Sequence, residues 1–293
     1  MAPAVSLLLT PRAFLRRRVV GLVRTLPSPL AGRTVMVTGA SSGIGEATAH
    51  AVAARGATVL LVARRAEELE RVRGDLEAAG GTAYAYACDL TEGASVDALV
   101  ARVLAEHGAV DMLVNNAGRS IRRSLEYSYD RMHDFERTMA VNYFGPVRLI
   151  LGLLPAMREQ RFGHVVNVVT WGVQIKAPRF AAYIASKTAL DTFSRIAGRE
   201  AYAENVTFTN LRLSLVRTEM IASVDHYERS PSKSPEQAAA LVVRALEDRP
   251  LTISTTVGNV AEVLNLLAPR LMDAVASAAS RRFPDSAAAR GEG

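Results

Sequence analysis

Short apolar runs alternate with segments of helical periodicity from residue 33 to about residue 255. The apolar runs predict seven strands, at Thr34–Val37, Thr58–Ala63, Thr82–Cys88, Asp111–Val114, His164–Val169, Val206–Leu213 and Leu251–Ser254. The segments between them predict helices over Ile44–Arg55, Ala66–Ala79, Ser95–Glu106, Arg131–Arg158, Ala182–Ala203 and Pro235–Leu246. Nearly continuous apolar strands separated by helices favour a parallel sheet covered on both faces, and therefore a three-layer α/β fold.

The two ends of the chain have a different pattern. Residues 1–30 form a basic amphipathic stretch with five arginines and no acid, which suits a membrane surface, an organelle transit peptide or a solvated extension. Residues 257–293 predict an amphipathic helix followed by a flexible tail of small residues. The apolar positions of that helix are Val260, Val263, Leu264, Leu267, Leu271 and Val275. We therefore expect one domain over residues 31–256 with an extension at each end.

Charge and composition exclude several classes of function. The net charge of +6 comes from the N-terminal arginines, because the rest of the chain holds 30 basic and 29 acidic residues. A nearly neutral body lacks the basic face that nucleic-acid binding requires. The single cysteine, Cys88, excludes an internal disulfide and indicates a reducing, cytoplasmic setting. None of the five histidines is expected beside carboxylates at ligand spacing, so we expect no metal site.

A glycine-rich turn follows the first predicted strand and begins the first helix. Glycine is needed there because the backbone must turn sharply and approach a pyrophosphate, which the N–H groups of the helix N-terminus then bind. The residues expected to contact the cofactor in this turn are Gly39, Ser41, Ser42, Gly43, Ile44 and Gly45. The second strand ends at Ala63, where an NAD enzyme would place an acid for the ribose hydroxyl. Arg64 and Arg65 instead favour a 2′-phosphate, and therefore NADP(H).

Four motifs in this order resemble the short-chain dehydrogenase/reductase family over residues 31–255. They are Thr38-x3-Gly43-Ile44-Gly45, Asn115-Asn116-Ala117-Gly118, Val141-Asn142-Tyr143 and Tyr183-x3-Lys187. The resemblance implies a doubly wound, seven-stranded parallel Rossmann-type sheet, hydride transfer from a nicotinamide, and a homo-dimer or homo-tetramer. It also implies further cofactor contacts at Asp89, Leu90, Asn116, Ala117, Gly118, Tyr183, Lys187, Val216 and Thr218.

The expected catalytic residues are Asn142, Thr170, Tyr183 and Lys187. Tyr183 and Lys187 share one helix face, where an ammonium would lower the pKa of the phenol toward the working pH. Only three of the 35 basic residues are lysines, which makes a lysine at this position informative. By resemblance, Lys187 also binds the nicotinamide ribose and Asn142 holds a water that relays protons. Thr170 occupies the position of the family's serine, and its hydroxyl can still donate to a carbonyl oxygen.

The substrate is indicated by longer segments that resemble the bacterial fatty acyl-CoA reductases, which convert long-chain acyl-CoA to aldehyde. They are Ala117–Ser124, His133–Met139, Asn142–Gly145, Ala177–Phe180, Asn205–Thr209 and Phe283–Ser286. Arg119, Arg122 and Arg123 could pair with CoA phosphates or form a solvated loop. Alternatives are reduction of another lipophilic ketone, 3-oxoacyl or steroid-like, and a non-catalytic NADP-binding protein at a membrane. We expect a lipophilic carbonyl or acyl-CoA substrate and peripheral membrane contact through residues 1–30.

Overall fold

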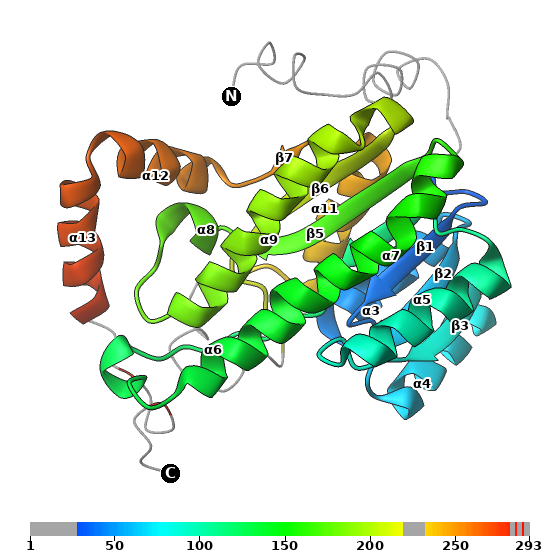
Figure 1. Ribbon diagram of the computed structural model, residues 1–293, viewed down its shortest axis with the longest axis horizontal. Helices are drawn as coiled ribbons and strands as arrows, with labels where there is room; N and C mark the ends of the chain where they lie inside the picture. The colour runs from blue at the N-terminus through cyan, green and yellow to red at the C-terminus, as the bar shows by residue number, and fades with distance from the viewer. Residues whose placement is uncertain (1–27, 219–231, 282–284, 286–288, 290–293) are drawn as a thin grey trace.

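One parallel sheet of seven strands runs through the molecule, in the order β3-β2-β1-β4-β5-β6-β7 (Figure 1). The computed structural model describes residues 28–218, 232–281, 285 and 289. The strands are β1 (Thr34–Thr38), β2 (Thr58–Ala63), β3 (Thr82–Ala87), β4 (Met112–Asn115), β5 (Gly163–Thr170), β6 (Val206–Leu213) and β7 (Thr252–Ile253). The predicted seven-stranded, doubly wound Rossmann-type sheet is confirmed.

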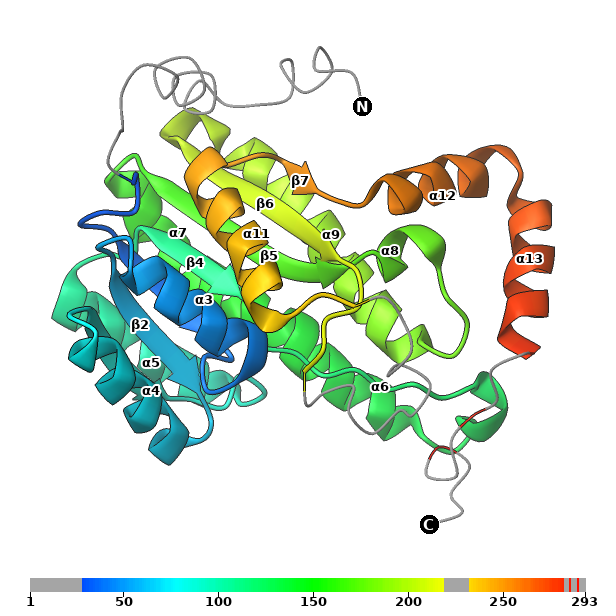
Figure 2. The ribbon, with the colours of Figure 1, turned by 180° about the vertical axis from the view of Figure 1, so that it is seen from behind.

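Helices cover both faces of the sheet. One face carries α3 (Gly43–Ala53), α4 (Ala66–Ala78) and α11 (Pro235–Asp248), and the other carries α5 (Gly93–His107), α7 (Gly145–Glu159) and α9 (Ala181–Glu200) (Figures 1 and 2). The alternation along β1 divides the core between these layers. Val35 and Val37 pack with the first set of helices, whereas Met36 packs with the second. All three side chains are fully buried, which makes the order of the layers a direct result of the apolar pattern.

The direction of winding reverses beside β1, which pairs in parallel with both β2 and β4. In an open α/β sheet the carboxyl ends of the strands separate at such a reversal and leave a crevice. Thr38, the last residue of β1, joins the two sides: its hydroxyl accepts hydrogen bonds from the backbone N–H groups of Asn116 and Ala117, each at 3.0 Å. The crevice therefore opens next to the glycine-rich turn.

The long helix expected over Arg131–Arg158 contains a wider segment in its middle. Its parts are α6 (Met132–Met139), the π-helix η2 (Ala140–Phe144) and α7. By length and apolar content the span Met132–Glu159 would suffice to cross a membrane. Four of its apolar residues, Leu149, Ile150, Leu153 and Met157, are buried against the sheet, whereas Phe144 and Leu151 are exposed. Three short helical turns were not predicted: η1 (Leu125–Tyr127), α8 (Gly172–Ile175) and η3 (Tyr202–Glu204).

The C-terminal pattern predicted as one helix forms two, α12 (Thr256–Leu267) and α13 (Pro269–Arg281). The break lies at Ala268, because the proline ring that follows disfavours the helical conformation at this residue. Gln174 of α8 fastens α12, donating hydrogen bonds from Nε2 to Asn259 and Glu262. α13 extends away from the sheet and buries none of its side chains (Figures 1 and 2). The basic N-terminal stretch, apart from residues 28–30, lies outside the described residues.

Candidate active site

An open cavity of about 1780 Å³ lies at the carboxyl ends of the strands. It is lined by every residue expected to act in catalysis or cofactor binding except Gly45 and Asn142, which lie behind its wall. The structure thus brings together Gly39, Ser41, Ser42, Gly43, Ile44, Arg64, Arg65, Asp89, Leu90, Asn116, Ala117, Gly118, Thr170, Tyr183, Lys187, Val216 and Thr218. The crevice of the fold and the motifs of the sequence therefore define the same site.

The glycine-rich turn has the shape of an anion cradle. Gly39 and Gly43 have φ angles of +66° and +57°, a region that other residues rarely adopt. A Cβ on Gly45 would lie 2.0 Å from the carbonyl oxygen of Gly39, so only glycine allows α3 to approach the turn. The Ser42 side chain makes no capping bond to α3, which leaves N–H groups of its first turn to a ligand. These features fit the pyrophosphate of a dinucleotide.

Arg65 extends from the end of β2 to the glycine-rich turn. Its Nη2 atom donates a hydrogen bond of 3.2 Å to the hydroxyl of Ser41. The pKa of the Asp89 carboxyl lies below its ordinary value. Burial raises this pKa, but the hydrogen bonds from Thr91 and the charge of Arg64 together lower it by more. A guanidinium and a hydroxyl held together in this way suit a phosphate monoester on the adenosine ribose.

Two hydroxyl groups meet at the opposite end of the cavity. Thr170 ends β5 and Tyr183 lies in the first turn of α9, and both side chains line the cavity. The backbone N–H of Gly172 donates to Thr170 Oγ1, at 3.1 Å, which fixes the threonine rotamer. Burial raises the pKa of Tyr183 to about 12, against the smaller lowering effect of the neighbouring Thr170 side chain. Tyr183 is therefore a protonated donor over the whole neutral range.

Lys187 is buried one turn after Tyr183 and points its ammonium group to the sheet. Its Nζ atom donates a hydrogen bond of 3.0 Å to the carbonyl oxygen of Val168. Burial lowers its pKa to about 8. Lys187 was expected to lower the pKa of Tyr183, but in the structure this pKa is raised. The reason is geometric, because the ammonium is bound to a backbone carbonyl while the phenol loses hydration.

Asn142 is fully buried in the π-helical segment, and its side-chain amide forms hydrogen bonds with other groups of the protein. Its Nδ2 atom donates to the carbonyl oxygen of Arg119 and to Ser186 Oγ, and its Oδ1 atom accepts from the N–H of Arg119, all at 2.9 Å. A Cβ on Gly118 would lie 3.0 Å from that Oδ1 atom. The amide therefore fastens the loop after β4 to α9. Neither Arg119 nor Ser186 was identified as a partner of Asn142, because no sequence spacing relates them.

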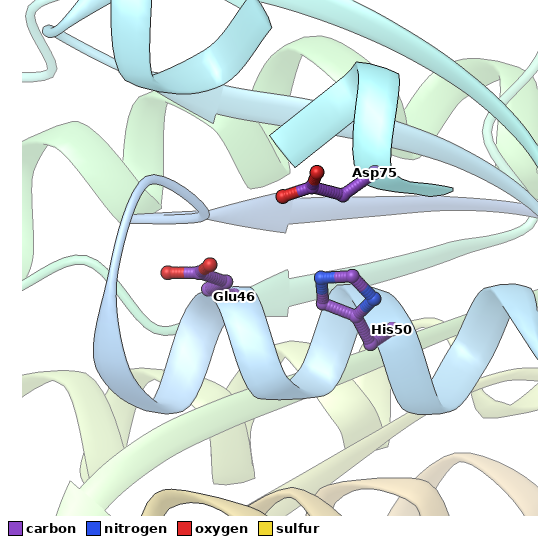
Figure 3. A group of neighbouring side chains, drawn as sticks. All are labelled: Glu46, His50 and Asp75. Atoms are coloured by element: carbon purple, nitrogen blue, oxygen red, sulfur yellow. The ribbon is translucent and has the colours of Figure 1, made fainter. Parts of the chain in front are cut away.

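A second polar cluster lies where Glu46 and His50 of α3 meet Asp75 of α4 (Figure 3), and of these three residues only Glu46 lines the cavity. Their possible ligand atoms lie within 4.8 Å of one another, so the expectation that no histidine lies beside carboxylates is wrong for His50. Arg71 already neutralises both acids, with ion pairs of 2.9 Å to Glu46 and 3.1 Å to Asp75. Since a guanidinium bridges these carboxylates, we assign the cluster no metal.

Comparisons with known proteins agree with this geometry. A family model described as short chain dehydrogenase matches residues 33–229. The chain is 47% identical over 261 residues to a fatty acyl-CoA reductase of Acinetobacter baylyi, covering 89% of this chain and 88% of that protein. An uncharacterised oxidoreductase of Mycobacterium tuberculosis is also 47% identical, over 285 residues, covering 96% and 84%.

Solved structures have the same fold. A 3-oxoacyl (acyl-carrier-protein) reductase of Agrobacterium tumefaciens with NADP bound is similar at a TM-score of 0.69 and 30% identity. The match covers 75% of this chain and 88% of that one.

Proposed function

Since the chain belongs to the short-chain dehydrogenase family of oxidoreductases, we propose that it uses NADPH to reduce the thioester of a long-chain fatty acyl-CoA to a fatty aldehyde. The 47% identity to a fatty acyl-CoA reductase over nearly the whole chain supports this substrate. The observation that carries the proposal is that apolar side chains line the cavity together with the two hydroxyls. These side chains are Trp171, Ile175, Phe180, Ile184, Leu213 and Leu215.

The chemistry needs two donors on one carbonyl oxygen. When bound, the cofactor would supply the hydride to the thioester carbon. Tyr183 and Thr170 line the same cavity, and Thr170 is near enough to lower the pKa of the phenol, so their O–H groups can both reach the carbonyl oxygen. Thr170 would stabilise the charge that develops on this oxygen, and Tyr183 would protonate it. Lys187 would orient the cofactor ribose, and Asn142 would hold the loop after β4 in position.

No cysteine nucleophile takes part in this scheme. Cys88 is buried, and burial raises the pKa of its thiol, so the thiolate is disfavoured. Ser95 donates a hydrogen bond of 3.4 Å to its sulfur. Direct attack of hydride on the thioester, with loss of the CoA thiol from the resulting hemithioacetal, needs only the two hydroxyls described above.

The preference for NADPH follows from the residues at the end of β2. Arg65 and Ser41 form a ready donor pair, and Arg64 adds a second positive charge where an NAD enzyme would have an acid. The structural relative with 3-oxoacyl substrates also has NADP bound.

A substrate panel tests the proposal. Incubation with NADPH and palmitoyl-CoA should release free thiol and fatty aldehyde, whereas oxidation of NADPH with ketones alone would favour the 3-oxoacyl or steroid-like alternative. Tyr183→Phe separates both from a non-catalytic role. Turnover of every carbonyl at the wild-type rate by this variant would show that Tyr183 is not catalytic.

We also expect a cytoplasmic homo-dimer or homo-tetramer, with peripheral membrane contact through residues 1–30. The exposed apolar side chains of α12 and α13, among them Val260, Leu267 and Leu271, supply surface for a subunit contact. Sedimentation of the purified protein measures the oligomer. Deletion of residues 1–30 should weaken binding to anionic liposomes, and an unchanged partition would reject the membrane contact.

A further inference from the structure

A basic wall, made of Arg119, Arg122, Arg123 and Arg137, lines the same cavity as Thr170 and Tyr183. Its arginines come from the loop after β4 and from α6. Asp134 is the only acid that these two segments contribute to the cavity lining in the described part of the chain. Positive charge therefore accumulates on this wall of the cavity.

Asp134 neutralises only part of this charge. Its carboxylate is buried and forms ion pairs with Arg131 at 2.9 Å, with Arg137, and with Arg123 at 3.8 Å. Burial raises the pKa of Asp134, but the hydrogen bonds from Arg131 and Arg137 outweigh it, so the carboxylate stays ionised. One carboxylate thus forms ion pairs with three guanidinium groups, so the net charge of these four side chains is positive.

Arg119 is the arginine of the basic wall whose backbone is bound to Asn142. Both its backbone N–H and its carbonyl oxygen are bound to Asn142, which fixes its Cα next to the catalytic set. Among the residues that the structure describes, no carboxylate lies within ion-pair distance of its guanidinium. Burial and the charge of Arg137 lower the pKa of Arg119, Asp134 raises it, and Arg64 lowers it. Like charges held close together repel one another, and a bound anion would offset that repulsion.

We propose that the basic wall is a binding subsite for the phosphate groups of the substrate's thiol-bearing half, with Arg119 as its principal contact. This inference rests on the proposed reduction of an acyl-CoA. Guanidinium groups bind phosphate through paired hydrogen bonds, and CoA carries three phosphates at the end remote from the thioester. The phosphates of the dinucleotide have separate partners, in the turn that begins α3 and in the Arg65–Ser41 pair.

Two thioesters with the same acyl chain test the subsite. Palmitoyl-CoA carries the phosphates, and palmitoyl-pantetheine lacks them. In Arg119→Gln, KM for palmitoyl-CoA should rise at least about tenfold with little change in kcat, as expected for loss of one charge-assisted hydrogen bond. KM for palmitoyl-pantetheine and for NADPH should stay within about twofold of wild type. Arg199→Gln, at an exposed arginine of α9 outside the cavity, is the matched control and should change none of these constants.

Equal increases in KM for the two thioesters, or an increase for NADPH instead, would overturn the proposal. Calorimetry of CoA binding to the NADP⁺-saturated protein separates the subsite from the reaction. Wild type should bind CoA at least about tenfold more tightly than Arg119→Gln. Equal CoA affinity in the two proteins, or no binding at all, would reject the subsite whatever the reaction. CoA binding that depends on Arg119, without reduction of any thioester, would support the subsite and refute the proposed function.

Discussion

Thr170 is the proposed catalytic residue at which the chain departs from the serine expected at this position. Its hydroxyl accepts a hydrogen bond from Gly172 N–H and lowers the pKa of Tyr183, while a Cβ on Gly172 would lie 3.2 Å from its methyl carbon. The methyl group thus faces Gly172, and the hydroxyl is available to substrate. A threonine in this orientation can donate the same hydrogen bond as a serine.

Removal of the Thr170 hydroxyl should therefore impair catalysis more than removal of its methyl group. We expect Thr170→Ala to lower kcat about 100-fold, the usual cost of losing one oxyanion donor. Thr170→Ser keeps the donor and should stay within about tenfold of wild type. Steady-state oxidation of NADPH measures both. Full activity of Thr170→Ala would mean that Tyr183 alone holds the carbonyl oxygen.

The pH dependence of reduction should report Lys187. Burial lowers its pKa to about 8, so it is an ammonium below this pH and a neutral amine above it. Deprotonation above this pH removes the charged donor that is proposed to orient the cofactor ribose. The value of kcat/KM should therefore be level below pH 8 and fall above it. Lys187→Met should be slow and nearly independent of pH between 6 and 9; a wild-type rate that rises through pH 8 would contradict this role.

At the scale of elements, the strands and the amphipathic helices could be predicted because each has a period that the sequence displays. The π-helical segment could not, since Ala140–Phe144 continues the apolar pattern of its neighbours. The division of the C-terminal pattern at Ala268 was missed, although Pro269 gave the signal. The first of these differences concerns the proposed active site, because the π-helical segment carries Asn142.

The approach of α3 to the glycine-rich turn can be tested with two glycines. Gly45→Ala would place a methyl group 2.0 Å from the Gly39 carbonyl oxygen, so the turn must shift and NADPH should bind at least about tenfold more weakly. Gly74→Ala is the matched control in α4, where a Cβ meets nothing within 4 Å. That control should bind NADPH normally and gain about 0.5–1 kcal/mol of stability from its helix propensity. Calorimetry and thermal unfolding measure both effects; unchanged NADPH affinity in Gly45→Ala would refute the close-packing argument.

At the scale of the whole molecule, the motifs could be assigned to one site because they follow strands of a parallel sheet, whose carboxyl ends share an edge. Contacts between distant segments could not. Asp285, for example, accepts a hydrogen bond of 3.1 Å from the N–H of Ser124 and pairs at 3.3 Å with Arg179. The orientation of Lys187 likewise depends on packing around Val168. Side-chain partners of this kind follow from tertiary structure alone.

The central claim is that hydride passes directly from NADPH to the carbonyl carbon of an acyl-CoA. The most direct measurement uses NADPH deuterated at the transferable C4 position together with palmitoyl-CoA, with mass analysis of the product and titration of the released thiol. We predict one deuterium on the aldehyde carbon and one free thiol for each NADPH oxidised. NADPH oxidised without thiol release, or aldehyde formed without deuterium, would contradict it.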